Sequence, residues 1–163
     1  MKKLVLLLSW LIISGSVSAQ SGTNLKELEN LAKQGDLAAQ IELANTYRKG
    51  IGVSQDYKTA VKWFILAEEQ GDAVSQYNLG IMHSFGLGIV PDYQFAIKWY
   101  TLAAEQGNAL AQYNLGRMYY LGKGVPDNLV YAHMWATQAS SNGLNIAIDF
   151  LRFANRINEK KVN

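Results

Sequence analysis

The sequence has no cysteine and only two prolines and two histidines among its 163 residues. The lack of cysteine excludes disulfides, cysteine zinc sites and a cysteine nucleophile, so the fold must be held by packing alone. Neither His83 nor His133 has a second histidine or a carboxylate three or four residues later, as a zinc motif on a helix would need. The sequence also lacks a Gly-x-Ser-x-Gly elbow. We therefore predict no catalytic residues, no metal site and no cofactor.

Long apolar runs are also missing, apart from one at the start of the chain. Two lysines at the N-terminus precede an apolar run, Leu4–Ile13, and Val17-Ser18-Ala19 follows it. A basic start, a short apolar stretch and small residues before a cleavage point are typical of an export signal. The alternative is an uncleaved membrane anchor, but the run is shorter than the ~20 residues that a spanning helix needs. We predict a cleavable signal peptide over residues 1–19, and a periplasmic or, alternatively, secreted mature protein.

The charges are almost balanced. The whole chain has 15 Lys and Arg against 13 Asp and Glu, and removal of Lys2 and Lys3 with the leader would leave 13 of each. A balanced chain without a basic block argues against nucleic acid or an anionic membrane surface as the main partner.

What the chain does have is a repeat of 36 residues. The segment AAEQGNALAQYNLGRMYYLG at residues 103–122 has a close copy at 68–86 and a fainter copy at 34–50. A fixed period in this range predicts stacked units, each of which buries an apolar face only against its neighbours. The positions that recur include glycine, leucine and tryptophan: Gly35, Gly71, Gly107 and Gly143; Leu43, Leu79, Leu115 and Leu151; Trp63, Trp99 and Trp135.

Each unit is predicted to be a pair of helices. Asp72 can cap a helix N-terminus, glycines such as Gly86 can end a helix, and the apolar residues between them recur at helical spacing. This gives three helix pairs, over residues 37–70, 73–106 and 109–142. Single helices over 24–34 and 145–160 are predicted to cap the two ends, since polar residues replace the stacking positions near the C-terminus.

Small residues recur inside the first helix of each pair, at Ala44, Gly80 and Gly116. Glycine inside a helix costs about 1 kcal/mol relative to alanine. We therefore expect two helix backbones to approach closely here, with Ala60, Ala96 and Ala132 on the facing helix. The repeated tryptophans are expected to pack within or between repeats rather than to form a ligand cage, because each ring buries a large area. His83 takes the place of Tyr47 and Tyr119, which favours a packed aromatic substitute, and His133 stands at a stacking position.

The segment AEQGNALAQYNLGRMYYLGKGV at residues 104–125 and its counterparts resemble the Sel1-like repeat, a relative of the tetratricopeptide repeat. The resemblance covers residues 24–160. It implies an all-α fold, a right-handed α-α superhelix (solenoid) of about three full repeats with a capping helix at each end. It also implies a non-enzymatic scaffold or adaptor in the bacterial envelope, or secreted, whose partner is another protein or peptide segment.

Several roles stay open within this resemblance. One alternative is a periplasmic immunity protein that neutralises a delivered toxic effector, such as a lipase. Another class is an envelope hydrolase or a β-lactam-binding protein, but the relatives associated with β-lactams are rich in cysteine and this chain has none. A third is a small-ligand binder. We expect a monomer that binds neither nucleic acid nor a membrane.

By analogy with tetratricopeptide repeats, the first helix of each pair should line a concave groove. At the positions of Arg48, Phe85, Arg117 and Tyr120 the character of the residue changes between copies, which a stacking position could not tolerate. For Tyr77 and Tyr113, packing within the repeat is an equally good interpretation. The predicted partner-binding residues are Ile41, Asn45, Arg48 and Lys49 in the first copy, Tyr77, Ile81, Ser84 and Phe85 in the second, and Tyr113, Arg117, Tyr120 and Leu121 in the third.

Overall fold

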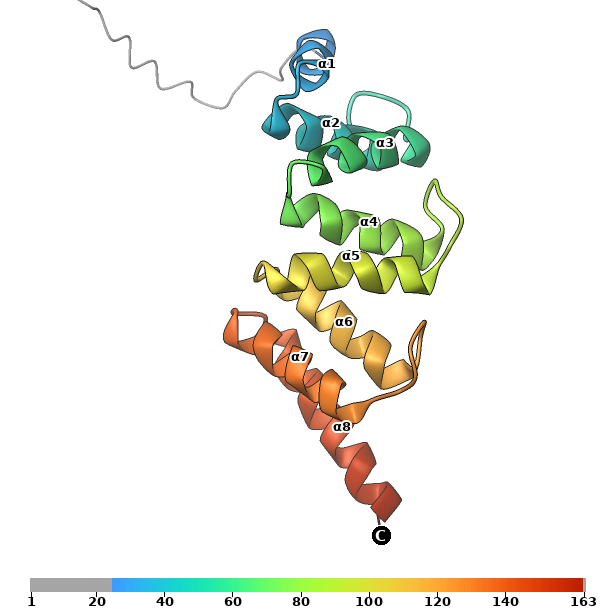
Figure 1. Cartoon of the computed structure of the whole chain (residues 1–163), viewed down its shortest axis with the longest axis vertical. Helices are drawn as coiled ribbons and strands as arrows, with labels where there is room; N and C mark the ends of the chain where they lie inside the picture. The colour runs from blue at the N-terminus through green and yellow to red at the C-terminus, as the bar shows by residue number, and fades with distance from the viewer. Residues whose placement is uncertain (1–24, 163) are drawn as a thin grey trace, which may run out of the picture.

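The structure is a computed structural model that describes residues 25–162, and these form eight α-helices and no strand. Each helix contacts the next along the chain, so the helices form one elongated stack (Figure 1). The predicted all-α solenoid is confirmed. The predicted leader, residues 1–19, lies outside the described residues. Within residues 25–162, no helix has both the length and the apolar character needed to cross a bilayer. The helices are α1 (Leu25–Lys33), α2 (Leu37–Lys49), α3 (Tyr57–Glu68), α4 (Ala73–Phe85), α5 (Tyr93–Glu105), α6 (Ala109–Leu121), α7 (Leu129–Ser141) and α8 (Ile146–Val162).

The helix starts follow the repeat. The side chain of Asp72 accepts a hydrogen bond from the Ser75 backbone N–H at 2.6 Å, which satisfies one of the free donors at the start of α4. An Asp or Asn does the same for every helix from α2 to α7: Asp36, Asp56, Asp72, Asp92, Asn108 and Asn128.

The glycine loops join each repeat to the one before it. Gly122 ends α6 in the left-handed conformation, at a φ of 62°. Gly124 follows at a φ of 76°, and a Cβ built on it would lie only 2.7 Å from the Tyr93 Cβ. The loop after α6 therefore rests on the first residue of α5, and only glycine allows the contact. Gly88 makes the corresponding contact with Tyr57, one repeat earlier.

The tryptophans pack as predicted. Trp63 lies against both the cluster of α1 and α2 and the cluster of α2, α3 and α4. Trp99 packs against the latter cluster, and Trp135 packs against the cluster of α5 and α6. All three indoles are only partly exposed, and each helps to join one repeat to the preceding one.

The small residues in the first helices work in two different ways. A Cβ built on Gly116 would lie 3.0 Å from the Ala132 carbonyl oxygen and 3.3 Å from the Ala136 backbone nitrogen. This is the predicted close approach of two helix backbones. A Cβ on Gly80 would instead lie 2.5 Å from the Tyr100 ring, so in the second repeat a side chain, and not Ala96, fills the space that the glycine leaves.

A series of side-chain amides also repeats along the stack. Gln70 Nε2 donates to Gln40 Oε1 at 2.8 Å, Gln106 donates to Gln76 at 2.8 Å, and Asn142 donates to Gln112 at 2.9 Å. The acceptor glutamines are buried. Because a buried amide without a partner is costly, these bonds fix the register of successive helix pairs.

The two histidines differ. His83 is buried and its ring stacks on Phe95 at 5.2 Å between centroids, which confirms the interpretation as a packed aromatic substitute. Burial lowers the pKa of the His83 imidazole, and the negative charge of Asp92 partly opposes this. The expectation that His133 occupies a stacking position is wrong. Its side chain is exposed on α7 and lies 3.4 Å from the Thr137 hydroxyl, and within residues 25–162 only the single helix α8 follows α7.

Candidate partner-binding site

The twelve predicted residues lie on the three first helices, α2, α4 and α6. On α2, Arg48 donates to the Asn45 side-chain oxygen at 3.0 Å, and Asn45 donates to the Ile41 carbonyl. Lys49 is exposed beside them. Arg48, Asn45 and the Ile41 carbonyl thus form a local polar network on one helix. They are not part of the pocket that the other two helices share.

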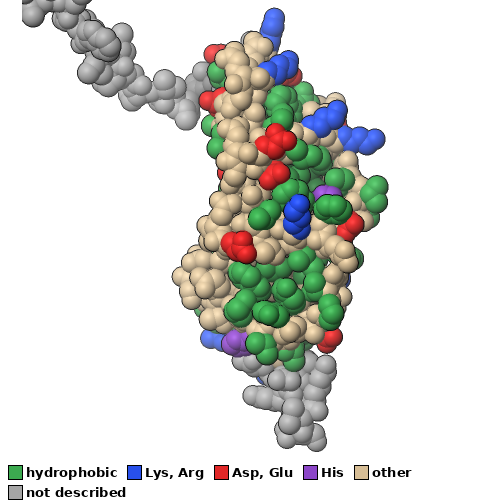
Figure 2. All heavy atoms as spheres, in the orientation of Figure 1, with side chains coloured by type: hydrophobic (Ala, Val, Ile, Leu, Met, Phe, Trp, Pro, Cys, Tyr) green, Lys and Arg blue, Asp and Glu red, His purple; other side chains and the backbone are tan. Residues whose placement is uncertain are grey.

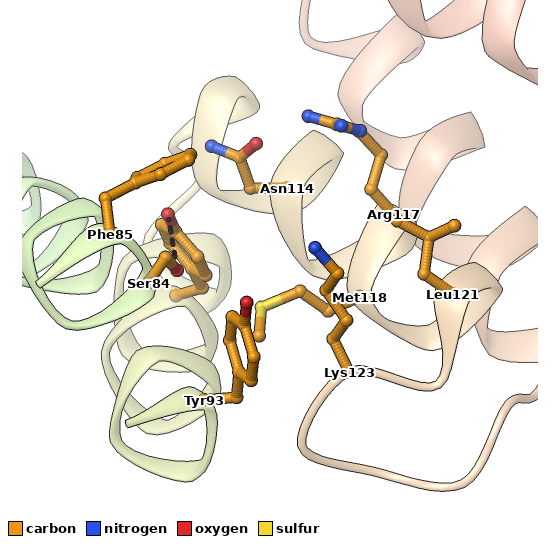
Figure 3. Close-up of a pocket in the computed structure, with 9 residues that line it drawn as sticks. Ser84, Phe85, Tyr93, Asn114, Arg117, Met118, Leu121 and Lys123 are labelled. Atoms are coloured by element: carbon orange, nitrogen blue, oxygen red, sulfur yellow. Dashed lines mark hydrogen bonds between the residues drawn. The ribbon is translucent and has the colours of Figure 1, made fainter. Parts of the chain in front are cut away.

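A pocket with a volume of about 110 Å³ lies between α4 and α6. Four of the predicted residues line it: Ser84 and Phe85 from α4, and Arg117 and Leu121 from α6. Phe85 and Leu121 are 72% and 51% exposed, so they stand as apolar residues at its rim. The remaining lining residues are Tyr93, Tyr100, Asn114, Met118 and Lys123 (Figure 3).

The hydroxyl of Tyr100 brings a buried polar group to the pocket. The Tyr100 ring passes under Gly80, and its hydroxyl accepts a hydrogen bond from Ser84 Oγ at 3.3 Å. Burial raises the pKa of Tyr100 to about 12, so the hydroxyl stays neutral at physiological pH. Beside it, the centre of the Tyr77 ring lies 6.1 Å from that of the Tyr100 ring. Tyr77 and Ile81 also pack against the core cluster of α5 and α6.

Two cations of the pocket rest on aromatic rings. The Arg117 guanidinium lies 5.7 Å from the centre of the Tyr113 ring, and the Lys123 ammonium lies 5.4 Å from that of Tyr93. Cation–π contacts of this kind hold a long side chain in place without neutralising its charge. Among the described residues, no carboxylate forms an ion pair with either cation.

Two tyrosines of α6, Tyr113 and Tyr120, face the last helix. The Phe150 ring lies 5.9 Å from the Tyr113 ring and 5.5 Å from the Tyr120 ring, both in edge-on geometry. Phe153 also contacts Tyr120, at 6.2 Å. Tyr113 and Tyr120 therefore pack against α8 and keep only part of their surface for a partner.

Sequence reasoning left out five lining residues. Lys123 lies in the glycine loop after α6, and Tyr93 is the first residue of α5. Met118 and Tyr100 are core residues that also reach the pocket. The sequence carries one signal for the pocket. Position 123 is a lysine, whereas the equivalent positions in the other copies are Ile51 and Leu87.

Nothing in the described residues groups ligands for a metal. Residues 25–162 contain no cluster of three or more His, Asp or Glu side chains that could hold an ion. The pocket offers hydrogen-bond donors and cations. No histidine or carboxylate lines it that could act as a base for a nucleophile such as the Ser84 hydroxyl.

The family profile of the Sel1 repeat matches residues 37–72, 73–108 and 109–144. The chain belongs to the Sel1 repeat family. Sel1 repeats generally mediate protein–protein interactions, and proteins of this family are typically non-catalytic scaffolds. The three matched units coincide with the three helix pairs and their closing turns.

Solved structures of Sel1 repeat proteins are similar to this chain. A Sel1 repeat protein from Oxalobacter formigenes is 37% identical, with a TM-score of 0.70, over 78% of this chain and 96% of that one. A protective antigen of uropathogenic Escherichia coli with the SLR fold is also 37% identical, with a TM-score of 0.71, over 73% of this chain but 26% of the antigen. Helicobacter pylori cysteine rich protein B, at 23% identity and a TM-score of 0.62 over 80% and 98% of the two chains, shares the fold. No protein of curated function matches the chain.

Proposed function

We propose that this Sel1 repeat protein is a non-enzymatic scaffold of the bacterial envelope, or a secreted one, that binds a segment of another protein across α4 and α6. The observation that carries the proposal is the pocket between these helices. Its rim exposes Phe85 on α4 and Leu121 on α6, and Arg117 lies across the pocket from Phe85. Aromatic, arginine and large apolar side chains that gather in one pocket are the residues that supply most of the binding energy in protein interfaces.

The location is inferred from the N-terminal leader pattern, residues 1–19, and the balanced charge of the remaining chain supports a protein rather than a nucleic acid as partner. The absence of a nucleophile–base pair in the pocket supports a binding role over a hydrolytic one.

The test is capture of partners from the native cell envelope by the tagged wild-type protein and by Phe85→Ala/Arg117→Ala. Both side chains are exposed, so their removal should leave the fold intact. We expect the variant to capture at least tenfold less of the partner than the wild type does, as quantified by mass spectrometry.

The matched control is Val130→Ala/Met134→Ala on α7. Val130 and Met134 are 78% and 46% exposed but lie outside the pocket. Figure 2 shows hydrophobic side chains gathered over the C-terminal half of the stack and also nearer the N-terminal end. Recovery of the same partners by wild type and by the α4–α6 variant would remove the basis for the proposal.

A further inference from the structure

We infer that the α4–α6 pocket binds an acidic side chain, aspartate or glutamate, next to an apolar side chain in an extended segment of the partner. The inference rests on the proposed function and specifies the chemistry of its partner. The pocket contains two cations, Arg117 and Lys123, and no acidic residue. Asp92, which precedes the lining residue Tyr93, accepts hydrogen bonds from the Gln94 and Phe95 backbone N–H groups and caps α5, and Asp127, four residues after Lys123, does not line the pocket.

The cations are specific to this junction between repeats. At the position of Arg117 the other copies have Asn45 and Ile81, and at the position of Lys123 they have Ile51 and Leu87. The fold of the repeat therefore does not require either charge. Two cations placed at one junction of a chain with balanced charge indicate a partner that carries the opposite charge.

The positions of the two cations suit a carboxylate. Figure 3 shows the Lys123 ammonium and the Tyr93 hydroxyl pointing into the space between α4 and α6, with Arg117 and Asn114 along one edge of it. The contact of Arg117 with Tyr113, at 5.7 Å, holds the guanidinium before a partner arrives. A guanidinium can donate two parallel hydrogen bonds to one carboxylate, and the ammonium can add a third.

The apolar rim determines the rest of the ligand. Phe85 lies across the pocket from Arg117 and is 72% exposed, and Leu121 is 51% exposed. An apolar residue next to the acid would cover these side chains while the acid meets the cations. The pocket volume of about 110 Å³ suits one or two side chains of a bound segment. It is smaller than the ~300–1,000 Å³ of pockets that enclose a drug-sized molecule.

The test is selection from a library of random twelve-residue peptides on the purified full chain. Each peptide is fused to its carrier at its C-terminus, so that a carboxylate can come only from a side chain. The variant is Arg117→Glu/Lys123→Glu. The control is Lys98→Glu, since Lys98 is an exposed lysine that rests on Trp99 at 5.1 Å but lies outside the pocket. All three proteins are first shown to melt at the same temperature.

We expect wild type and the Lys98 control to enrich peptides with Asp or Glu beside Leu, Ile, Phe, Tyr or Trp. The charge-reversed variant should lose these peptides, and a synthetic hit should bind it at least tenfold more weakly by fluorescence anisotropy. Replacing the acid of that hit by its amide, Glu→Gln, should weaken binding to wild type by a similar factor. Binding should also weaken as salt rises, because the charges lie near the surface.

Four outcomes would overturn the inference. Selection of neutral or basic peptides by the wild type, or equal binding of the hit to wild type and charge-reversed protein, would refute the acidic ligand while the scaffold function stands. If the capped amino acid N-acetylglutamate amide bound as tightly as the hit, the pocket would be a site for small carboxylates. If no peptide were enriched, the inference would fall, and the partner capture with Phe85→Ala/Arg117→Ala would separately decide the scaffold function.

Discussion

The second and third repeats bring their two helices together in different ways. In the second repeat, Gly80 leaves room for the buried ring of Tyr100, which separates the helices at that point. In the third repeat, Gly116 faces Ala136, at the position that corresponds to Tyr100, and the two backbones approach directly. The equivalent glycine therefore makes room for a side chain in the second repeat and for a helix backbone in the third.

This difference has a consequence for function. The Tyr100 ring places its hydroxyl beside Ser84 at the α4–α6 pocket. Ala136 has no hydroxyl to place at the corresponding point, and Tyr113 and Tyr120 of α6 pack instead against Phe150 of α8. The junction of the second and third repeats thus leaves a pocket with polar groups among apolar side chains, while the junction of the third repeat and the cap is filled by aromatic rings.

The largest expected effect comes from making the second repeat resemble the third. Tyr100→Ala should lower the free energy of unfolding by about 3–4 kcal/mol, because the separated helices cannot close around the cavity. Urea unfolding followed by circular dichroism measures this. Tyr100→Phe keeps the ring and should lose only about 1 kcal/mol, the net contribution of one hydrogen bond. A cost for Tyr100→Ala no larger than that of Tyr100→Phe would mean that the ring does not separate the helices.

The reverse change overfills the third repeat. Gly116→Leu should destabilise by about 2–3 kcal/mol, because the new side chain meets the backbone of α7, which cannot move aside. This should lower the melting temperature by roughly 10 °C. Arg117→Leu, one residue along and exposed, serves as the control and should change the melting temperature little. An unchanged melting temperature for Gly116→Leu would reject the close approach of α6 and α7.

A smaller effect tests whether Gly80 and Tyr100 act together. Gly80→Ala should cost about 1–2 kcal/mol, because the added methyl group meets the ring. In the Tyr100→Ala background the same substitution should be neutral or stabilising, since alanine favours a helix over glycine by about 1 kcal/mol. A double-mutant cycle measured by urea unfolding gives the coupling. If the stability changes of the two substitutions simply added, Gly80 and the Tyr100 ring would not be coupled.

The smallest effect concerns pH. Burial holds the pKa of His83 below its ordinary value, so the folded state resists protonation more than the unfolded state does. This contribution to stability is present above the ordinary pKa of histidine, about 6.5, and is lost as pH falls toward the folded value. His83→Tyr, which copies the third repeat, should reduce the loss of melting temperature between pH 7.5 and 5. If the melting temperatures of wild type and variant fell by the same amount between pH 7.5 and 5, His83 would make no such contribution to stability.

The sequence predicts the architecture well because the features that define it recur every 36 residues. The cap at Asp72, the left-handed glycine at Gly86 and the packed Trp99 each have counterparts in the other copies. His133 was misplaced because the repeat alone does not show that no further pair covers α7. The pocket could be predicted only in part, since it forms where residues at unrelated positions of two repeats meet, such as Tyr93 and Lys123.

The repeat also does not predict the contacts of α8. Phe150 and Phe153 stand where Asn114 and Arg117 stand one period earlier, so periodicity predicts neither their type nor their contacts with Tyr120. The caps differ in sequence from the repeats because they must end the stack.

Photo-crosslinking in the cells that make the protein tests whether a partner protein occupies the α4–α6 pocket. A p-benzoylphenylalanine at position 85, in the pocket, is compared with one at position 130, on exposed α7. We expect a specific protein adduct from position 85 that disappears with Arg117→Glu/Lys123→Glu, and no adduct of that mass from position 130. An adduct from position 130 alone, or no adduct from position 85, would contradict it.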